Sequence, residues 1–331
     1  MNPGNRRVNR RSIQIVLGVL WLIDGMLQLQ PYMFTQGFAT KVIAPAAVGQ
    51  PEWVAWPVHQ AASVIGSHPV ALDVLFALIQ LALGIGFLWR RTARVAVVVS
   101  VVWAVGIWFV GEGLGGLAGG SSSMLMGAPG AAFLYAVLAL AAWPRSRGRL
   151  EAEDRPGAGG VAEWFPLAWA AIWLDLALLA LLPANRSAST VSAQIDGAVG
   201  QVPSWLGSID HWAANGVHAV GEPMVVFLAV VPASVGLLAL GTPRQRTIAA
   251  WFGIVLALVS WVIGQNFGFL ASGTATDPNT GPLLALSGVA LLGVQTSRQW
   301  STHLDGRTKE ANHTVGIREG FAVESPSAIV A

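Results

Sequence analysis

Two acidic residues lie deep inside apolar stretches of the chain. Asp24 lies about a dozen residues into the run 12–30, and Asp175 lies at a similar depth in the run 162–182. At the rise of a helix, each would be roughly 18 Å from the start of its run. A carboxylate in hydrocarbon costs at least ~2.5 kcal/mol on insertion scales and is typically kept for proton relay, ion binding or pairing. The alternative is a protonated acid hydrogen-bonded to a neighbouring side chain.

A second set of polar candidates lies in a glycine-rich stretch that occurs twice. A single offset of 153 aligns seven identical residues without a gap: Trp108, Gly111, Gly115, Leu117, Ala118, Gly120 and Pro129 with Trp261, Gly264, Gly268, Leu270, Ala271, Gly273 and Pro282. Glu112 and Gln265 are then equivalent. Irregular backbone at membrane depth is tolerated only against protein or water. One interpretation is a partly re-entrant loop that binds a polar solute through Glu112, Gln265 and the glycines 111, 115, 264 and 268. The other is tight helix packing with an ordinary outer turn.

Histidines offer a third kind of site. His59 and His211 match at an offset of 152, and with nearby carboxylates they could hold zinc, copper or haem. Their spacing to the next histidines does not repeat the HxxxH pattern that holds one metal on a helix. Interfacial packing is the alternative. The absence of cysteine excludes thiolate metal sites and thiol nucleophiles. No GxSxG motif is present, so the sequence favours a protein that is not an enzyme.

These residues must be positioned by membrane helices. Hydrophobic residues make up 54% of the 331 residues and charged residues 11%, which is outside the range of soluble domains. The mean hydropathy is +0.58. Eight apolar runs follow one another: 12–30, 70–89, 95–110, 129–143, 162–182, 223–240, 248–263 and 282–294. The sequence therefore predicts an all-α integral membrane protein with eight transmembrane helices in the lipid bilayer.

The basic residues predict the orientation. Arginines precede the first run, follow the last, and occupy the connections after the second, fourth and sixth runs, whereas only Lys41 and Arg186 lie on the other side. The positive-inside rule then places both termini in the cytoplasm of a bacterial inner membrane. Topology accounts for the basic residues, so nucleic acid is not an expected partner.

The duplication extends along most of the chain. Trp21 and Pro31 match Trp173 and Pro183 at an offset of 152. Asp24 and Asp175 are one residue out of register, which weakens the case for a symmetric site made of two carboxylates. We expect two parallel four-helix repeats about a pseudo-twofold axis along the membrane normal. The expected division is a cytoplasmic lead (1–11), the first repeat (12–144), a cytoplasmic linker (145–161), the second repeat (162–297) and a disordered cytoplasmic tail (298–331).

Each repeat also contains a long outer segment, at 32–69 and 184–222. Tryptophans beside prolines in these segments are typical of helices at the level of the lipid headgroups. We call these two segments the outer collars.

One helix has a resemblance to a known family. The stretch Leu17-Gly-Val-Leu-Trp21-Leu-Ile-Asp24-Gly25 resembles the opening of DoxX-type bacterial membrane proteins. The loop after Gly264, with Ala275-Thr-Asp-Pro-Asn-Thr-Gly-Pro282, is similar to a pattern of uncharacterised actinobacterial membrane proteins. The resemblance implies a four-helix unit, here duplicated, and an association with membrane oxidoreductases or quinones. It assigns no catalytic residue.

The leading hypothesis is a transport or binding module for a small solute or ion, with a polar cleft that opens to the outside between the repeats. Glu112, Gln265 and the glycine loops would shape the site, and Asp24 or Asp175 would couple a proton or ion. An accessory subunit of a quinone-linked membrane oxidoreductase is the alternative. A further alternative is a metal or haem site at His59 and His211, and the sequence specifies no cofactor.

Overall fold

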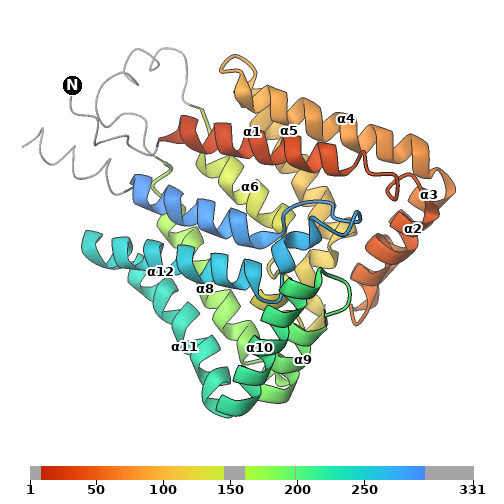
Figure 1. Cartoon of the computed structure of the whole chain (residues 1–331). Coiled ribbons are helices and arrows are strands. Elements are labelled where there is room, and N and C mark those ends of the chain that lie inside the picture. Colours follow the sequence, from red (N-terminus) through yellow and green to blue (C-terminus); the bar gives the residue numbers. More distant parts are fainter. Residues whose placement is uncertain (1–8, 145–160, 198, 295–331) are drawn as a thin grey trace, which may run out of the picture.

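The structure, a computed structural model, describes residues 9–144, 161–197 and 199–294, and its regular elements are all helices (Figure 1). The first half contains α1 (Arg10–Leu27), α2 (Gln36–Phe38), η1 (Ala39–Ile43), η2 (Ala44–Ala47), α3 (Glu52–Ser67), α4 (Pro69–Leu88), α5 (Ala93–Gly106), η3 (Ile107–Gly111), η4 (Gly113–Gly119), η5 (Met124–Met126) and α6 (Ala131–Ala141). The second contains α8 (Phe165–Ala180), η7 (Pro183–Asn185), α9 (Ala188–Asp196), α10 (Ser204–Val220), α11 (Glu222–Ala239), α12 (Pro243–Val262), η8 (Asn266–Phe269) and a final helix, Thr280–Val294. Most of the predicted lead and linker, and all of the predicted tail, lie outside the described residues.

Four of the described helices are long and apolar enough to cross a bilayer: α4, α5 continued through η3 to Gly111, α11 and α12. Three more apolar helices are shorter, namely α6, α8 and Thr280–Val294. Large apolar side chains are exposed along the four long helices, among them Leu78, Val102, Val226 and Phe252. Such a surface is stable against lipid and not against water. The structure therefore agrees with a helical membrane protein.

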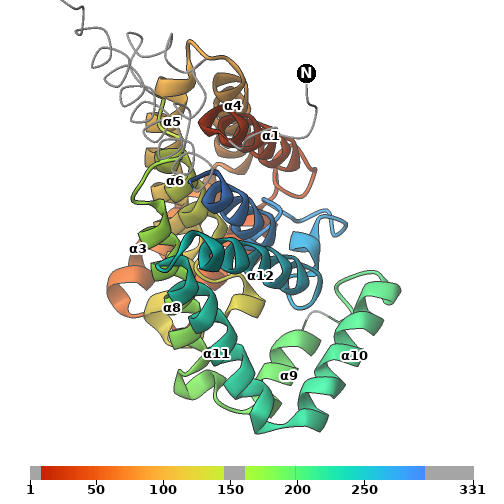
Figure 2. The ribbon, with the colours of Figure 1, turned by 90° about the vertical axis from the view of Figure 1, so that its left-hand side faces the viewer.

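The two least exposed helices lie at the centre. Leu134 and Leu138 of α6, and Leu283 and Leu291 of Thr280–Val294, are completely buried. The final helix lies between α1 and α12 in both views of the ribbon (Figures 1 and 2). One continuous apolar core joins these helices to α1 and α8, and so it includes residues of both halves.

The two halves share one helix pairing. In each half the first helix packs against the helix that follows the outer collar, α1 on α4 and α8 on α11. Trp21 of α1 donates a hydrogen bond from Nε1 to Ser100 Oγ of α5 over 3.0 Å. Trp173 of α8 lies at the matching place over Gly253 of α12, where an added Cβ would come within 3.0 Å of its ring. The offset of 152 between these tryptophans in the sequence therefore corresponds to equivalent positions in space.

Small residues allow α1 and α4 to approach closely. A Cβ at Gly84 would lie 2.5 Å from Leu22 Cγ and 2.8 Å from the backbone oxygen of Gly18. We therefore expect Gly84→Ala to lower the free energy of unfolding by about 1–3 kcal/mol, the usual effect of overpacking. The measurement is the melting temperature of the purified protein in detergent. Gly216→Ala in α10 is the control, because a Cβ there meets no atom within 4 Å; an equal loss in both variants would contradict tight packing at Gly84.

The outer collars are helical, as the sequence predicted for them. Helix α3 exposes Trp53 and Trp56, and α10 exposes Trp205 and Trp212. Rows of exposed tryptophan are typical of the membrane interface. Collar residues also form the outer walls of the cavities described below.

Candidate functional site

The two glycine loops are held by the same hydrogen bonds. In the first loop, Trp108 Nε1 donates to the oxygen of Pro129 over 2.8 Å, and Glu112 Oε1 accepts from the Ala132 amide over 3.0 Å. In the second, Trp261 Nε1 donates to the oxygen of Pro278 over 2.7 Å. Gln265 Oε1 accepts from the Gly281 amide over 3.0 Å. Glu112 and Gln265 are therefore equivalent in space, as their alignment predicted, and one oxygen of each closes its loop.

The alignment was wrong at the end of the loop. The gapless offset paired Pro129 with Pro282, but the hydrogen bonds pair it with Pro278, four positions earlier. The next residues, Gly130 and Asn279, both have positive φ, at 105° and 64°. Asparagine tolerates this left-handed conformation, so it replaces glycine there without a glycine signal in the sequence. The second loop is thus shorter, and Asp277 takes the place of Ala128.

A polar cleft of about 520 Å³ lies between the two loops. Glu112 and Gly115 line it from the first loop, and Gly268, Thr276 and Asp277 line it from the second. The sequence predicted a cleft that opens to the outside between the repeats, and that role stays a prediction. Among the predicted residues, Gly111, Gly264 and Gln265 do not line it. The amide of Gln265 instead donates from Nε2 to the oxygen of Met124 over 2.9 Å, so it joins the two loops.

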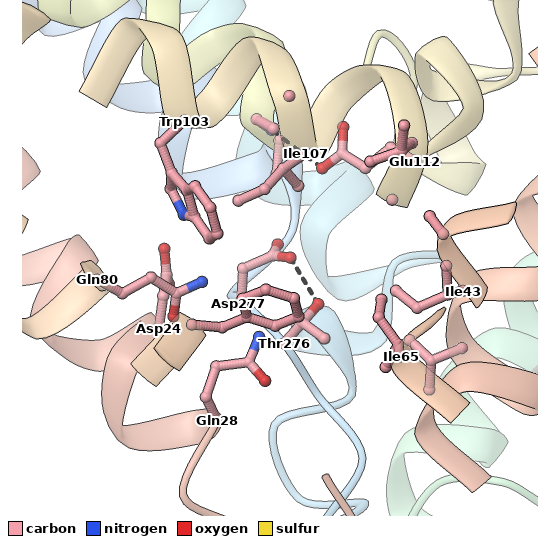
Figure 3. A pocket seen from close by; sticks show the side chains of 18 of the residues that line it. Asp24, Gln28, Ile43, Ile65, Gln80, Trp103, Ile107, Glu112, Thr276 and Asp277 are labelled. Atoms are coloured by element: carbon pink, nitrogen blue, oxygen red, sulfur yellow. Dashed lines mark hydrogen bonds between the residues drawn. The ribbon is translucent and has the colours of Figure 1, made fainter. Parts of the chain in front are cut away.

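A second cavity of about 370 Å³ lies behind the cleft, inside the first half (Figure 3). We call it the inner cavity. Its polar lining includes Asp24 of α1, Gln28 at the C-cap of α1, Gln80 of α4, Trp103 of α5, Tyr135 of α6, Glu112 and Asp277. Its apolar lining comes mainly from α2, η1, α3 and the first part of α4. Figure 3 shows Asp24, Gln28 and Gln80 on one side, Asp277 in the middle, and Ile43 and Ile65 on the opposite side.

Several buried polar atoms of the inner cavity have no hydrogen-bond partner in the protein. They are Asp24 Oδ1, Gln28 Oε1, Gln80 Oε1, Trp103 Nε1 and Glu112 Oε2. Asp24, Gln28 and Gln80 are between 2% and 5% exposed. An unsatisfied buried polar group costs about 1–3 kcal/mol, so a cluster of them around one cavity indicates a place for water or a ligand. Tyr135 of α6 stands beside Asp24 in the same wall.

Glu112 and Asp277 form a wall between the cleft and the inner cavity, since both residues line both spaces, together with Ala131 and Thr276. Asp277 is held firmly: its Oδ2 accepts from Thr276 Oγ1 over 2.8 Å, and its Oδ1 accepts from the Asn279 amide over 2.7 Å. Burial and, to a smaller extent, the charge of Asp277 together raise the pKa of Glu112 to about 8. Burial also raises the pKa of Asp277. This wall is therefore acidic, and burial favours the protonated form of both acids.

The second half contains a matching cavity of about 370 Å³ with a different lining. At the places of Asp24, Gln28, Gln80 and Trp103 it has Leu176, Ala180, Pro232 and Leu256. Residues 123–125 of the first loop cover it, much as Thr276 and Asp277 of the second loop cover the inner cavity. Its amides are satisfied, because Gln194 Nε2 donates to Asn185 Oδ1 over 2.8 Å. Of these two cavities, and among the described residues, only the inner cavity is lined by unsatisfied polar atoms.

The remaining predicted residues lie apart from this site. Asp175 is half-buried on α8 and lines neither cavity; the residue equivalent to Asp24 is Leu176. His59 and His211 are exposed on separate collar helices, and His211 Nδ1 lies 3.3 Å from Asp196 Oδ1. Across the part of the chain that the structure describes, no group of three or more His, Cys, Asp or Glu could hold a metal ion. The metal hypothesis stays a prediction.

Five residues of the site were missed from the sequence: Gln28, Gln80, Trp103, Tyr135 and Asp277. Gln28 and Gln80 are amides inside apolar runs, a signal as visible as that of Asp24. Trp103 resembles the other tryptophans of the chain. Asp277 lies among turn-forming residues, and a turn of this kind needs no ligand to account for its sequence.

Comparison with known proteins finds no matching family model, no matching curated protein and no matching solved structure. The relation to DoxX-type proteins therefore stays a prediction, and the function has to be argued from the site.

Proposed function

We propose that the chain crosses a bacterial inner membrane eight times, as two parallel four-helix repeats with both termini in the cytoplasm. The equal order of helices and the shared loop hydrogen bonds support the repeats. The four additional spans would be α1, α8, α6 and Thr280–Val294. Helix α6 has only 11 residues, but it is surrounded by protein and follows a loop that folds inward. A span near the centre of a bundle can be short when such a loop completes the crossing.

We propose further that the protein binds a small solute and moves it across the membrane. The observation that carries this proposal is the pair of spaces separated by Glu112 and Asp277. The cleft would receive the solute from the outside, and the inner cavity would bind it through its unpartnered polar atoms. Outer-collar residues line both spaces, and this supports an entrance on the side away from the arginine-rich connections.

Single cysteines can test this arrangement, because the chain has none of its own. We expect a membrane-impermeant thiol reagent, added to intact cells, to label Ser121→Cys in the cleft quickly and Gln80→Cys in the inner cavity more slowly. Thr92→Cys, in the connection between α4 and α5, should react only after the cells are permeabilised. The measurement is the labelling rate of each variant.

Ser287→Cys is the matched control, because Ser287 is buried in the packed final helix and lines neither cavity. It should not react in the folded protein. Labelling of Gln80→Cys no faster than of Ser287→Cys would show that the cleft does not lead to the inner cavity, and would overturn the proposed function. Labelling of Thr92→Cys from the outside would overturn the orientation.

A further inference from the structure

We propose that the ligand of the inner cavity is an amphipathic organic cation, a small amine or quaternary ammonium with an apolar chain. This inference rests on the proposed function and specifies its solute. The head group would lie between Asp24 and Asp277, and the chain would extend toward Ile43 and Ile65, as the arrangement in Figure 3 allows.

The charge of the lining selects a cation. Asp24, Glu112 and Asp277 all line the inner cavity, and none of its lining residues is Lys, Arg or His. A buried carboxylate without a positive partner is expensive unless it is protonated or paired. A positively charged ligand would supply the missing partner, whereas an anion would meet only repulsion.

The arrangement of the acids favours a cation larger than a metal ion. Within the described residues, these three acids do not form a group that could hold one metal ion. A metal ion needs its ligands within about 2–2.6 Å. A larger cation can contact acids that are too far apart to share a metal.

The other walls select an organic ligand. Trp21, Trp103 and Tyr135 line the cavity together with Asp24, and aromatic faces attract ammonium groups. Phe38, Val42, Ile43, Val64 and Ile65 also line it, and Figure 3 shows Ile43 and Ile65 on the side opposite Asp24. An apolar chain would fill that side with favourable burial. The volume of about 370 Å³ is at the lower end of the range for small-molecule pockets.

The apolar cavity of the second half shows that the fold does not require these polar groups. It has the same volume and the corresponding helices, but Leu176 and Leu256 replace Asp24 and Trp103. Unsatisfied polar atoms that a fold can do without are best explained by a ligand that contacts them.

The test is direct binding to the purified full chain in lipid nanodiscs, measured by titration calorimetry with empty nanodiscs subtracted. The probes are hexylammonium, hexyltrimethylammonium, hexanol and hexanoate, which share one chain and differ in the head group. We expect both ammonium probes to bind at least about tenfold more tightly than hexanol, as expected for one charge-assisted contact, and hexanoate not to bind. Asp24→Asn should weaken the ammonium probes by a similar factor, while Asp175→Asn should leave them unchanged.

The outcomes separate this inference from the proposed function. Equal affinity for hexanol and hexylammonium, or no effect of Asp24→Asn, would overturn the cationic class but leave a solute site. If none of the four probes binds while Gln80→Cys still reacts from the outside, the cationic class is overturned as well. A Gln80→Cys variant that is as unreactive as Ser287→Cys would remove the site itself, and the proposed function with it. The Asp24→Asn variant must keep the melting profile of the parent chain. If it does not, Gln28→Leu is the second variant, and it should also weaken the binding of the ammonium probes.

Discussion

Asp24→Leu is expected to stabilise the protein and to abolish ligand binding. Leucine is the residue that α8 carries at the equivalent place, Leu176, so the exchange is one that this fold already contains. Asp24 is 2% exposed and its Oδ1 has no partner. Removing an unsatisfied buried polar group should raise the free energy of unfolding by about 1–3 kcal/mol. The melting temperature would then rise by several degrees, while affinity for an ammonium probe falls below detection.

The reciprocal variant provides the control. Leu176→Asp places a carboxylic acid in the apolar cavity of the second half, where no lining residue is a basic side chain. We expect it to lower the free energy of unfolding by roughly 2 kcal/mol or more and to leave probe binding by the first half intact. The measurements are thermal unfolding and calorimetry on both variants. If Asp24→Leu melted earlier than the parent chain, Asp24 would be a structural acid with a partner, and its role in a ligand site would be contradicted.

Local patterns in the sequence predicted much of the fold. Apolar runs specify helices whichever way they pack, so the order of the elements followed from composition and spacing. The equivalence of Trp21 and Trp173, and of Glu112 and Gln265, was also visible, because the residues around each pair recur at a nearly constant offset. The number of spans does not follow in the same way, since short helices such as α6 depend on what surrounds them.

The asymmetry of the site could not be predicted from the repeat. A repeat suggests paired features, and the paired acids Asp24 and Asp175 are one residue out of register, which on a helix turns a side chain by about 100°. The structure puts Asp24 into the inner cavity and leaves Asp175 outside. Asp277 could not be predicted for a different reason. It lines the cavity from the other half, and the second loop is four residues shorter than the first, so the gapless offset did not align Asp277 with Ala128. A contact between distant segments leaves no pattern in either one.

The affinity for a permanently charged probe is expected to rise with pH and to level off above about pH 8. Glu112 lies in the loop one residue beyond the apolar stretch Ala93–Gly111, and burial raises its pKa to about 8, with the charge of Asp277 adding to the effect. Asp277, Asp24 and Tyr135 are the other titratable groups around the inner cavity. A cation favours the ionised form of Glu112, so binding below pH 8 must release a proton. Affinity for hexyltrimethylammonium should then change by up to about tenfold per pH unit between pH 6 and 8.

Glu112→Gln isolates this titration, because Gln265 shows that an amide closes the same loop with the same hydrogen bond. As the pH falls toward 6, ionising Glu112 becomes more costly, so the affinities of parent and variant for the quaternary probe should converge. At pH 9 only the parent carries the extra negative charge and should bind more tightly. Folding favours the protonated form of Glu112, so the folded protein loses stability as the pH rises from 4.5, the ordinary pKa, to about 8, the raised pKa. The melting temperature of the parent should therefore fall more steeply over this range than that of the variant. Equal pH profiles for parent and variant would show that the charge of Glu112 does not reach the ligand, and the wall between cleft and cavity would then be passive.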